Sequence, residues 1–189
     1  MNVFYEDLPE SLRIDGEDYK IITDFREWIR FSDMLKADMP AEYKYEFIKE
    51  MFLDDITLNP DTFEDVLKAI SSFLGMAEVQ LPTKYNTAGK SSSKANISYE
   101  YDAPYIISAF LQNYGIDLLE IEYMHWWKFK MLLDGLPEEC QIKQRIYYRD
   151  VDLSSIKDKA EQKRISKIKY RISLPENEYV SDGDIANAF

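Results

Sequence analysis

The fold is decided by residues 102–150, whose sequence is DAPYIISAFLQNYGIDLLEIEYMHWWKFKMLLDGLPEECQIKQRIYYRD. Apolar residues recur in this stretch at the three-to-four-residue spacing of an amphipathic helix. Gly115 and Gly135 stand where two of the periodic runs stop, and glycine commonly follows the last turn of a helix. The stretch therefore predicts three helices, over residues 102–114 with Asp102 as the cap, 118–133 and 137–149.

The N-terminal half continues the helical pattern after a short hairpin. Asp15-Gly16 lies between two short apolar runs within residues 12–23, which is the typical sequence of a two-residue β-hairpin turn. Apolar stripes then predict helices over residues 24–39, 41–53, 60–74 and, at the far end of the chain, 155–171. We therefore expect a mainly α protein, a compact multi-helix bundle with a small N-terminal β-hairpin and a long polar loop.

The polar loop is expected at about residues 78–98, where three serines stand in a row and little apolar material is present. This stretch is either a boundary between two helical halves or a long loop within one domain. Because each half is thin as an independent core, we predict a single helical domain over residues 1–172. Residues 173–189 lack periodicity and are acidic, so we predict a disordered tail there.

Composition is typical of a globular protein, with 46% hydrophobic residues and 31% charged ones. Cys140 is the only cysteine, so no disulfide forms within the chain, as expected in a reducing compartment. Residues 1–10 contain no basic cluster of the signal-peptide type, and no apolar run is long enough for a membrane span. We expect a cytoplasmic protein with no membrane partner.

The net charge of −12 is distributed unevenly. Residues 1–80 contain 19 acidic and 8 basic side chains, whereas residues 141–171 contain 4 acidic and 10 basic ones. The two regions attract each other within one chain or head to tail between copies, or they are simply two solvated faces. The acidic chain as a whole is repelled by nucleic acid, so no nucleic-acid partner is expected.

Residues with catalytic chemistry are scarce. His125 is the only histidine and Cys140 the only cysteine, so a metal site built from several His and Cys side chains is excluded within one chain. The six glycines show no phosphate-binding spacing. We expect no enzymatic activity, no catalytic residues, no metal and no cofactor.

Aromatic side chains make up 14% of the chain, and they dominate both protein cores and protein interfaces. The predicted 118–133 helix is apolar at adjacent positions, so it is either central in the bundle or pressed against a second chain. The candidate partner contacts are four aromatic and two basic residues: Tyr123, Trp126, Trp127, Phe129, Lys163 and Lys167. For His125, Trp126 and Trp127, we favour a position mainly in the core.

Several features of residues 102–150 occur together in one known family. They are Asp102 with Ile106 and Phe110, Tyr114-Gly115-Ile116-Asp117-Leu118, His125-Trp126 with Phe129, Leu136-Pro137, and Arg149. In these features the chain resembles the bacteriophage "gp fifteen" family of tailed phages and prophages of Gram-positive bacteria. The N-terminal half resembles the family more loosely.

The resemblance implies a tail assembly chaperone, since genes of this family typically lie between those for the tail tube and the tape measure. Such a protein, a homo-oligomer, binds the tape measure protein, the tail tube protein or both in the host cytoplasm and leaves before the virion is complete. The alternative is a structural tail component, such as a tail completion protein, that stays in the virion. The family implies no catalytic residues.

Overall fold

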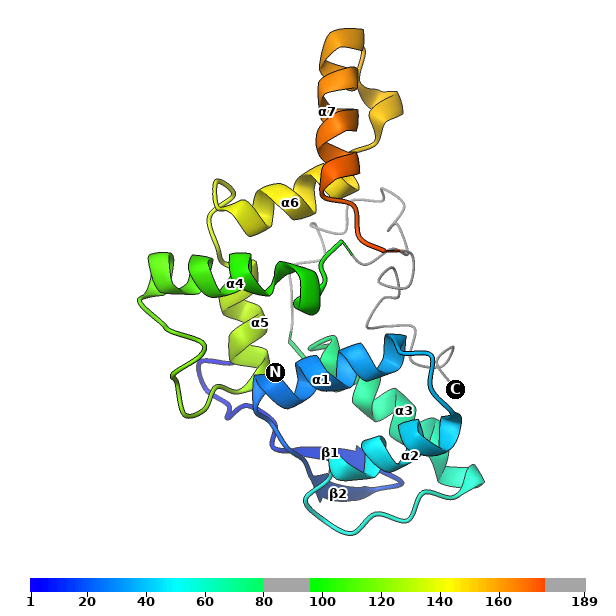
Figure 1. Ribbon diagram of the computed structural model, residues 1–189. Helices are drawn as coiled ribbons and strands as arrows, with labels where there is room; N and C mark the ends of the chain where they lie inside the picture. The colour runs from blue at the N-terminus through cyan, green and yellow to red at the C-terminus, as the bar shows by residue number, and fades with distance from the viewer. Residues whose placement is uncertain (80–95, 176–189) are drawn as a thin grey trace. The chain divides into compact units, whose positions relative to one another are not determined.

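The computed structural model of the protein describes residues 1–79 and 96–175. Within these ranges the chain forms seven α-helices, one short 3-10 helix and a two-stranded antiparallel hairpin (Figure 1). The prediction of a mainly α protein with a small N-terminal hairpin is thereby confirmed. Most of the predicted polar loop and most of the predicted acidic tail lie outside the described residues.

The described residues form two compact units, and each is considered by itself. The first unit contains residues 1–79 together with Tyr123–Lys130, and the second contains residues 96–122 and 131–175. The chain thus returns to the first unit for eight residues between two parts of the second. The single domain predicted over residues 1–172 stays a prediction.

The hairpin of the first unit consists of β1 (Ser11–Ile14) and β2 (Glu17–Lys20), paired from Ser11 opposite Lys20 to Ile14 opposite Glu17. Asp15 and Gly16 form its two-residue loop with φ values of 51° and 84°. Positive φ at both positions is the type I′ turn that matches the twist of the strands, and glycine adopts it without steric cost. β1 lies against α3, and the hairpin is thereby supported by the helices.

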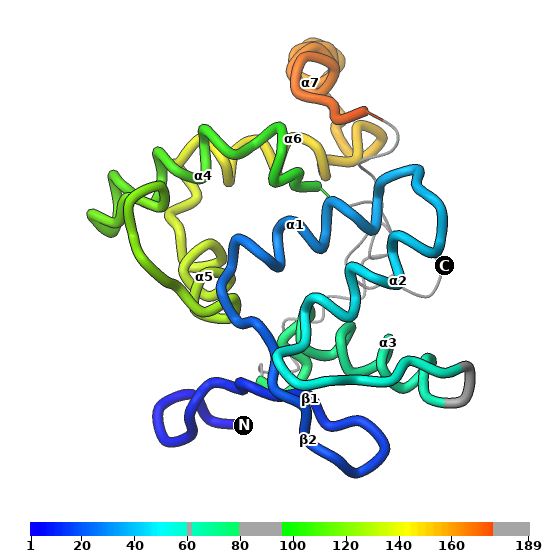
Figure 2. The backbone as a smooth tube through the Cα atoms, turned by 60° about the horizontal axis from the view of Figure 1, so that its bottom comes forward, coloured from blue at the N-terminus to red at the C-terminus, as the bar shows by residue number. Residues whose placement is uncertain are grey.

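Three helices complete the first unit: α1 (Phe25–Lys36), α2 (Ala41–Glu50) and α3 (Pro60–Leu74). The carboxylate of Asp24 accepts a hydrogen bond from the Arg26 N–H at 3.0 Å and so caps α1, as Asp does at many helix starts. α1 and α2 run side by side (Figure 2). Trp28 of α1 is fully buried, and its indole N–H donates to the Ile22 carbonyl at 2.7 Å.

The second unit contains α4 (Tyr99–Tyr114), α6 (Gln141–Asp150), the 3-10 helix η2 (Leu153–Ser155) and α7 (Lys159–Arg171). α6 lies between α4 and α7 and contacts both (Figure 1). α5 (Trp126–Asp134) begins in the first unit, and its last four residues belong to the second.

Four of the predicted helix starts are wrong. α6 begins at Gln141 rather than at residue 137, and α7 begins at Lys159 rather than at residue 155. α4 begins at Tyr99 rather than Asp102, and its cap is Ser98, whose hydroxyl accepts from the Tyr101 N–H at 3.2 Å. The helix predicted over 118–133 is also wrong, because α5 begins only at Trp126. After Asp117 the chain makes a single turn and then runs extended.

Asp102 lies inside α4 rather than at its N-cap, and its carboxylate is the centre of a buried ion-pair network. Arg149 donates to both of its oxygens, at 2.5 and 2.9 Å, in the two-pronged geometry that suits a guanidinium group. Arg145 and the Ser98 N–H complete the shell at 3.0 and 3.1 Å. Burial alone raises the pKa of Asp102, but the hydrogen bonds from Arg149, Ser98 and Arg145 outweigh it and hold the pKa below its ordinary value.

Arg149 also connects segments on either side of this pair. Its guanidinium group donates to the Asn96 carbonyl at 2.9 Å and to the Ile172 carbonyl at 2.7 Å. One side chain on α6 therefore joins the approach to α4, α4 itself and the residue that follows α7. The pair positions the helices of the second unit, because neither charge is stable there without the other.

We predict that Arg149→Met destabilises the protein by about 3–5 kcal/mol, because it leaves the Asp102 carboxylate buried without its main partner. The free energy of unfolding measured by urea titration with circular dichroism checks this. Arg164→Met, which breaks the exposed pair with Glu161, is the matched control and should leave the midpoint nearly unchanged. Equal midpoints for the two variants would contradict the role of Arg149.

Candidate functional site

The six predicted contact residues fall into two groups. Tyr123, Trp126, Trp127 and Phe129 belong to the segment of residues 123–130 that returns to the first unit, and the two lysines belong to α7 in the second. Trp126, Trp127 and Phe129 have exposed fractions of 0%, 1% and 1%. The sequence left core and partner surface open for these rings, and their burial favours the core.

Backbone pairing holds the returning segment in place. The Trp126 N–H donates to the Thr23 carbonyl at 2.8 Å, and the Phe25 N–H donates to the Met124 carbonyl at 2.9 Å. Asp24 and His125 therefore form an isolated antiparallel bridge, with these two hydrogen bonds on either side of it. The bridge keeps His125 out of a helix, since a residue that pairs in extended geometry cannot also be helical, and α5 begins at the next residue.

The bridge places two indole rings at the end of α3. The Trp127 indole N–H donates to the Phe73 carbonyl at 2.7 Å, and the Trp126 indole N–H donates to the Leu74 carbonyl at 3.3 Å. The last carbonyls of a helix have no partner within the helix. The Phe73 carbonyl also accepts from the Met76 N–H at 3.1 Å, so the Trp127 indole adds a second hydrogen bond there, and the Trp126 indole supplies a donor to the Leu74 carbonyl. Trp126 and Trp127 are thus both core rings and a cap on α3.

The remaining predicted contacts are on the surface. Tyr123 is 56% exposed although its hydroxyl lies 2.7 Å from that of Thr23, and Lys163 and Lys167 are exposed on α7. Contact between these three residues and a partner stays a prediction. For the three buried rings, contact would require the first unit to open.

His125 is held by a hydrogen bond at each ring nitrogen. Its Nδ1 accepts from the Trp127 N–H at 3.0 Å, so the proton of the neutral ring is on Nε2, which lies 3.0 Å from the Pro9 carbonyl oxygen. Burial lowers the pKa of His125, and the Pro9 carbonyl and the nearby Glu10 charge oppose this without reversing it. A second proton on Nδ1 would face an N–H, so His125 is a structural, neutral histidine rather than a catalytic base.

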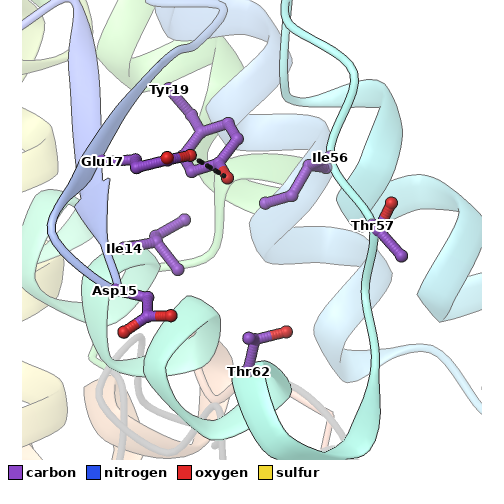
Figure 3. Close-up of a pocket in the computed structure, with 7 residues that line it drawn as sticks. All are labelled: Ile14, Asp15, Glu17, Tyr19, Ile56, Thr57 and Thr62. Carbon is purple, nitrogen blue, oxygen red and sulfur yellow. Dashed lines mark hydrogen bonds between the residues drawn. The ribbon is translucent and has the colours of Figure 1, made fainter.

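Hollows in the first unit offer little chemistry. The described residues contain no group of three or more His, Cys, Asp and Glu side chains that could hold a metal ion. A hollow of about 190 Å³ at the hairpin turn contains two carboxylates and three hydroxyls (Figure 3), from the residues Ile14, Asp15, Glu17, Tyr19, Ile56, Thr57 and Thr62. The Tyr19 hydroxyl points at the Glu17 carboxylate and donates to it at 3.1 Å. The residues that line this hollow include no histidine, lysine or cysteine.

The second unit presents a basic surface. A shallow hollow on α7 is lined by Ala160, Lys163, Arg164, Lys167, Ile168 and Arg171. Beside it, Tyr105, Tyr148 and Ile168 contribute to a second hollow of about 240 Å³ between α4, α6 and α7. Cationic side chains with a small apolar floor are suited to an acidic protein segment. This surface is the candidate functional site. It includes Lys163 and Lys167, which the sequence analysis named as candidate partner contacts.

Comparison with known proteins identifies one family. The family model described as Bacteriophage Gp15 protein matches residues 4–174, which is most of the chain. No curated protein matches, and no solved structure matches. Among the described residues, no helix has both the length and the apolar character needed to cross a membrane.

We predict that Trp127→Ala destabilises the protein by about 3–5 kcal/mol, because it empties a large core volume and removes the indole hydrogen bond to the Phe73 carbonyl. Urea unfolding checks this. Tyr170→Ala removes an aromatic ring that is 84% exposed and is the control, with a midpoint close to that of the unchanged protein. A stable, folded Trp127→Ala variant would show that the indole is not a core element.

The protein should also lose stability in mild acid. Because folding lowers the pKa of His125 below its ordinary value of about 6.5, the unfolded chain binds more protons just below that pH. The free energy of unfolding therefore falls as the pH drops from about 6.5 toward the folded-state pKa. In His125→Gln, which does not titrate, the urea midpoint should change less between about pH 7 and about pH 5. An equal slope in both proteins would contradict this.

Proposed function

Because the chain belongs to the Bacteriophage Gp15 protein family, we propose that it is a phage tail assembly chaperone that binds the tape measure protein, the tail tube protein or both. The observation that carries the proposal is the family match over residues 4–174, which includes every described helix and strand. The family match makes the chain a phage protein, and the chaperone role is the step that we add.

The chemistry of the described residues supports a binding protein. The single histidine is locked in a structural role, and no metal cluster is formed by the described residues. By contrast, several aromatic side chains are exposed, namely Phe4, Tyr5, Tyr43, Tyr101, Tyr123, Tyr147 and Tyr170. Tyrosine suits contacts with varied protein surfaces, because it combines a large apolar ring with a polar hydroxyl. We propose on this basis that the protein acts without catalysis or a cofactor.

We also propose where the chaperone acts and at which stage of tail assembly it leaves. The chaperone acts as a homo-oligomer in the cytoplasm of the host cell, holds its hydrophobic clients soluble, and is released before the virion is finished. A negative net charge keeps such an oligomer soluble while its exposed rings engage clients.

Co-expression with tape measure and tail tube fragments tests the function. We expect affinity-tagged protein to recover at least one of the two fragments, and to increase the soluble yield of the tape measure fragment. Recovery of neither fragment, under conditions in which the tagged protein is folded, would contradict the proposal.

Two controls sharpen this experiment. A tagged acidic protein of similar size and charge should recover neither fragment, so that charge alone is excluded as the cause. Mass spectrometry of purified particles then distinguishes a chaperone, which is absent, from a structural tail component, which is present.

A further inference from the structure

Two exposed rows of charge, one acidic and one basic, have the same spacing. On α2 the acidic row is Glu42, Glu46 and Glu50. On α7 the basic row is Lys163, Lys167 and Arg171. In each row the members are four residues apart, which places them about 6 Å from one another along one side of the helix.

The basic row has no acidic partner in the part of the chain that the structure describes. Lys163, Lys167 and Arg171 form no ion pair with residues 1–79 or 96–175, whereas the neighbouring Arg164 is paired with Glu161 at 2.6 Å. The remaining cation on the last turns, Lys169, donates to the Val151 carbonyl at 2.8 Å. Three cations that could each accept an acidic partner thus stand together.

The acidic row is nearly as open. Within the described residues, Glu42 and Glu50 form no ion pair, and Glu46 forms a single pair with Lys49 at 3.0 Å. The other lysine of α2, Lys44, is buried and donates to the Leu35 carbonyl, so it does not face this row.

From these rows we infer that the acidic row of α2 in one copy docks on the basic row of α7 in a second copy of this chain. The three glutamates of one row lie opposite the three cations of the other row, because the spacing is the same in both. The charges match whether the two helices run parallel or antiparallel. Rows of residues four apart lie along each other when two helix axes cross at about −50°, the commonest packing of helices. Tyr43 and Tyr170, which are 69% and 84% exposed, lie beside the rows and add apolar contact.

The interface is head to tail, because it joins two different surfaces. In a docked pair, one copy keeps an open basic row and the other keeps an open acidic row, so further copies add until a ring closes or a helical array forms. The inference rests on the homo-oligomer of the proposed function, whose interface it names, and it holds whether or not the clients are tail proteins.

A charge-swap experiment tests the interface. Mass is measured by light scattering after gel filtration between about 5 and about 200 µM protein, at about 25 mM and about 500 mM salt. The unchanged protein should gain mass with concentration at low salt, and its association should weaken by at least about tenfold at high salt. A protein that is monomeric throughout would overturn the inference.

Two reversed chains give the specific result. One carries Lys163→Glu, Lys167→Glu and Arg171→Glu, and the other carries Glu42→Lys, Glu46→Lys and Glu50→Lys. Each alone should be monomeric, because like charges now face each other. Mixed together they should associate again, since every row then meets its opposite.

The control reverses three exposed cations that lie elsewhere, with Arg13→Glu, Lys20→Glu and Lys128→Glu. It changes the net charge as much as the α7 variant does and should keep the mass of the unchanged protein. Circular dichroism verifies that all variants are folded. An α7 variant that still associates, or a mixture of the two reversed chains that stays monomeric, would overturn the inference. Client recovery is measured separately, so failure of this interface and failure of the chaperone proposal are distinguishable.

Discussion

The structure of the first unit depends on the pairing of residues 124–126 with residues 23–25. This short bridge brings Trp126 and Trp127 to the end of α3, where their indole N–H groups satisfy the Phe73 and Leu74 carbonyls. Without the returning segment, the last carbonyls of α3 would lose these two indole donors, and the core would lose two of its three fully buried tryptophan rings. The first unit is therefore discontinuous in sequence, and its completion awaits a part of the chain about fifty residues beyond α3, a non-local closure that carries an entropic cost in folding.

The second unit is organised by a different interaction. Its centre is the buried pair of Asp102 and Arg149, around which α4 and α6 are positioned. A buried ion pair adds little net stability compared with an apolar core, but it penalises every arrangement that separates the two charges. The pair thus supports a defined geometry in a unit whose helix α7 has only a thin apolar stripe, with Ile165 as its buried member.

Sequence reasoning succeeded where a local rule decides the outcome and failed where a distant partner does. Asp24 as a cap, Pro60 as a helix start and Asp15-Gly16 as a turn all follow from short-range geometry, and the structure contains each of them. The prediction of a helix over 118–133 failed because an apolar run that pairs with a remote segment has the same composition as a buried helix. Asp102 was taken for a cap because Asp is favoured at helix starts, while its real partner, Arg149, is 47 residues away and invisible to any local rule.

The residues that carry the family likeness and those that contact a partner need not be the same. Asp102, Arg149 and the His125-Trp126 pair are buried, and each has a structural role in the contacts described above. These residues stabilise the fold, and in this conformation they are too deeply buried to contact a partner. Binding must therefore use surface residues, for which hydrophobic periodicity carries no signal because they face water. The only trace that such residues leave in a single sequence is the sign and spacing of their charges, and α2 and α7 show opposite signs at the same spacing.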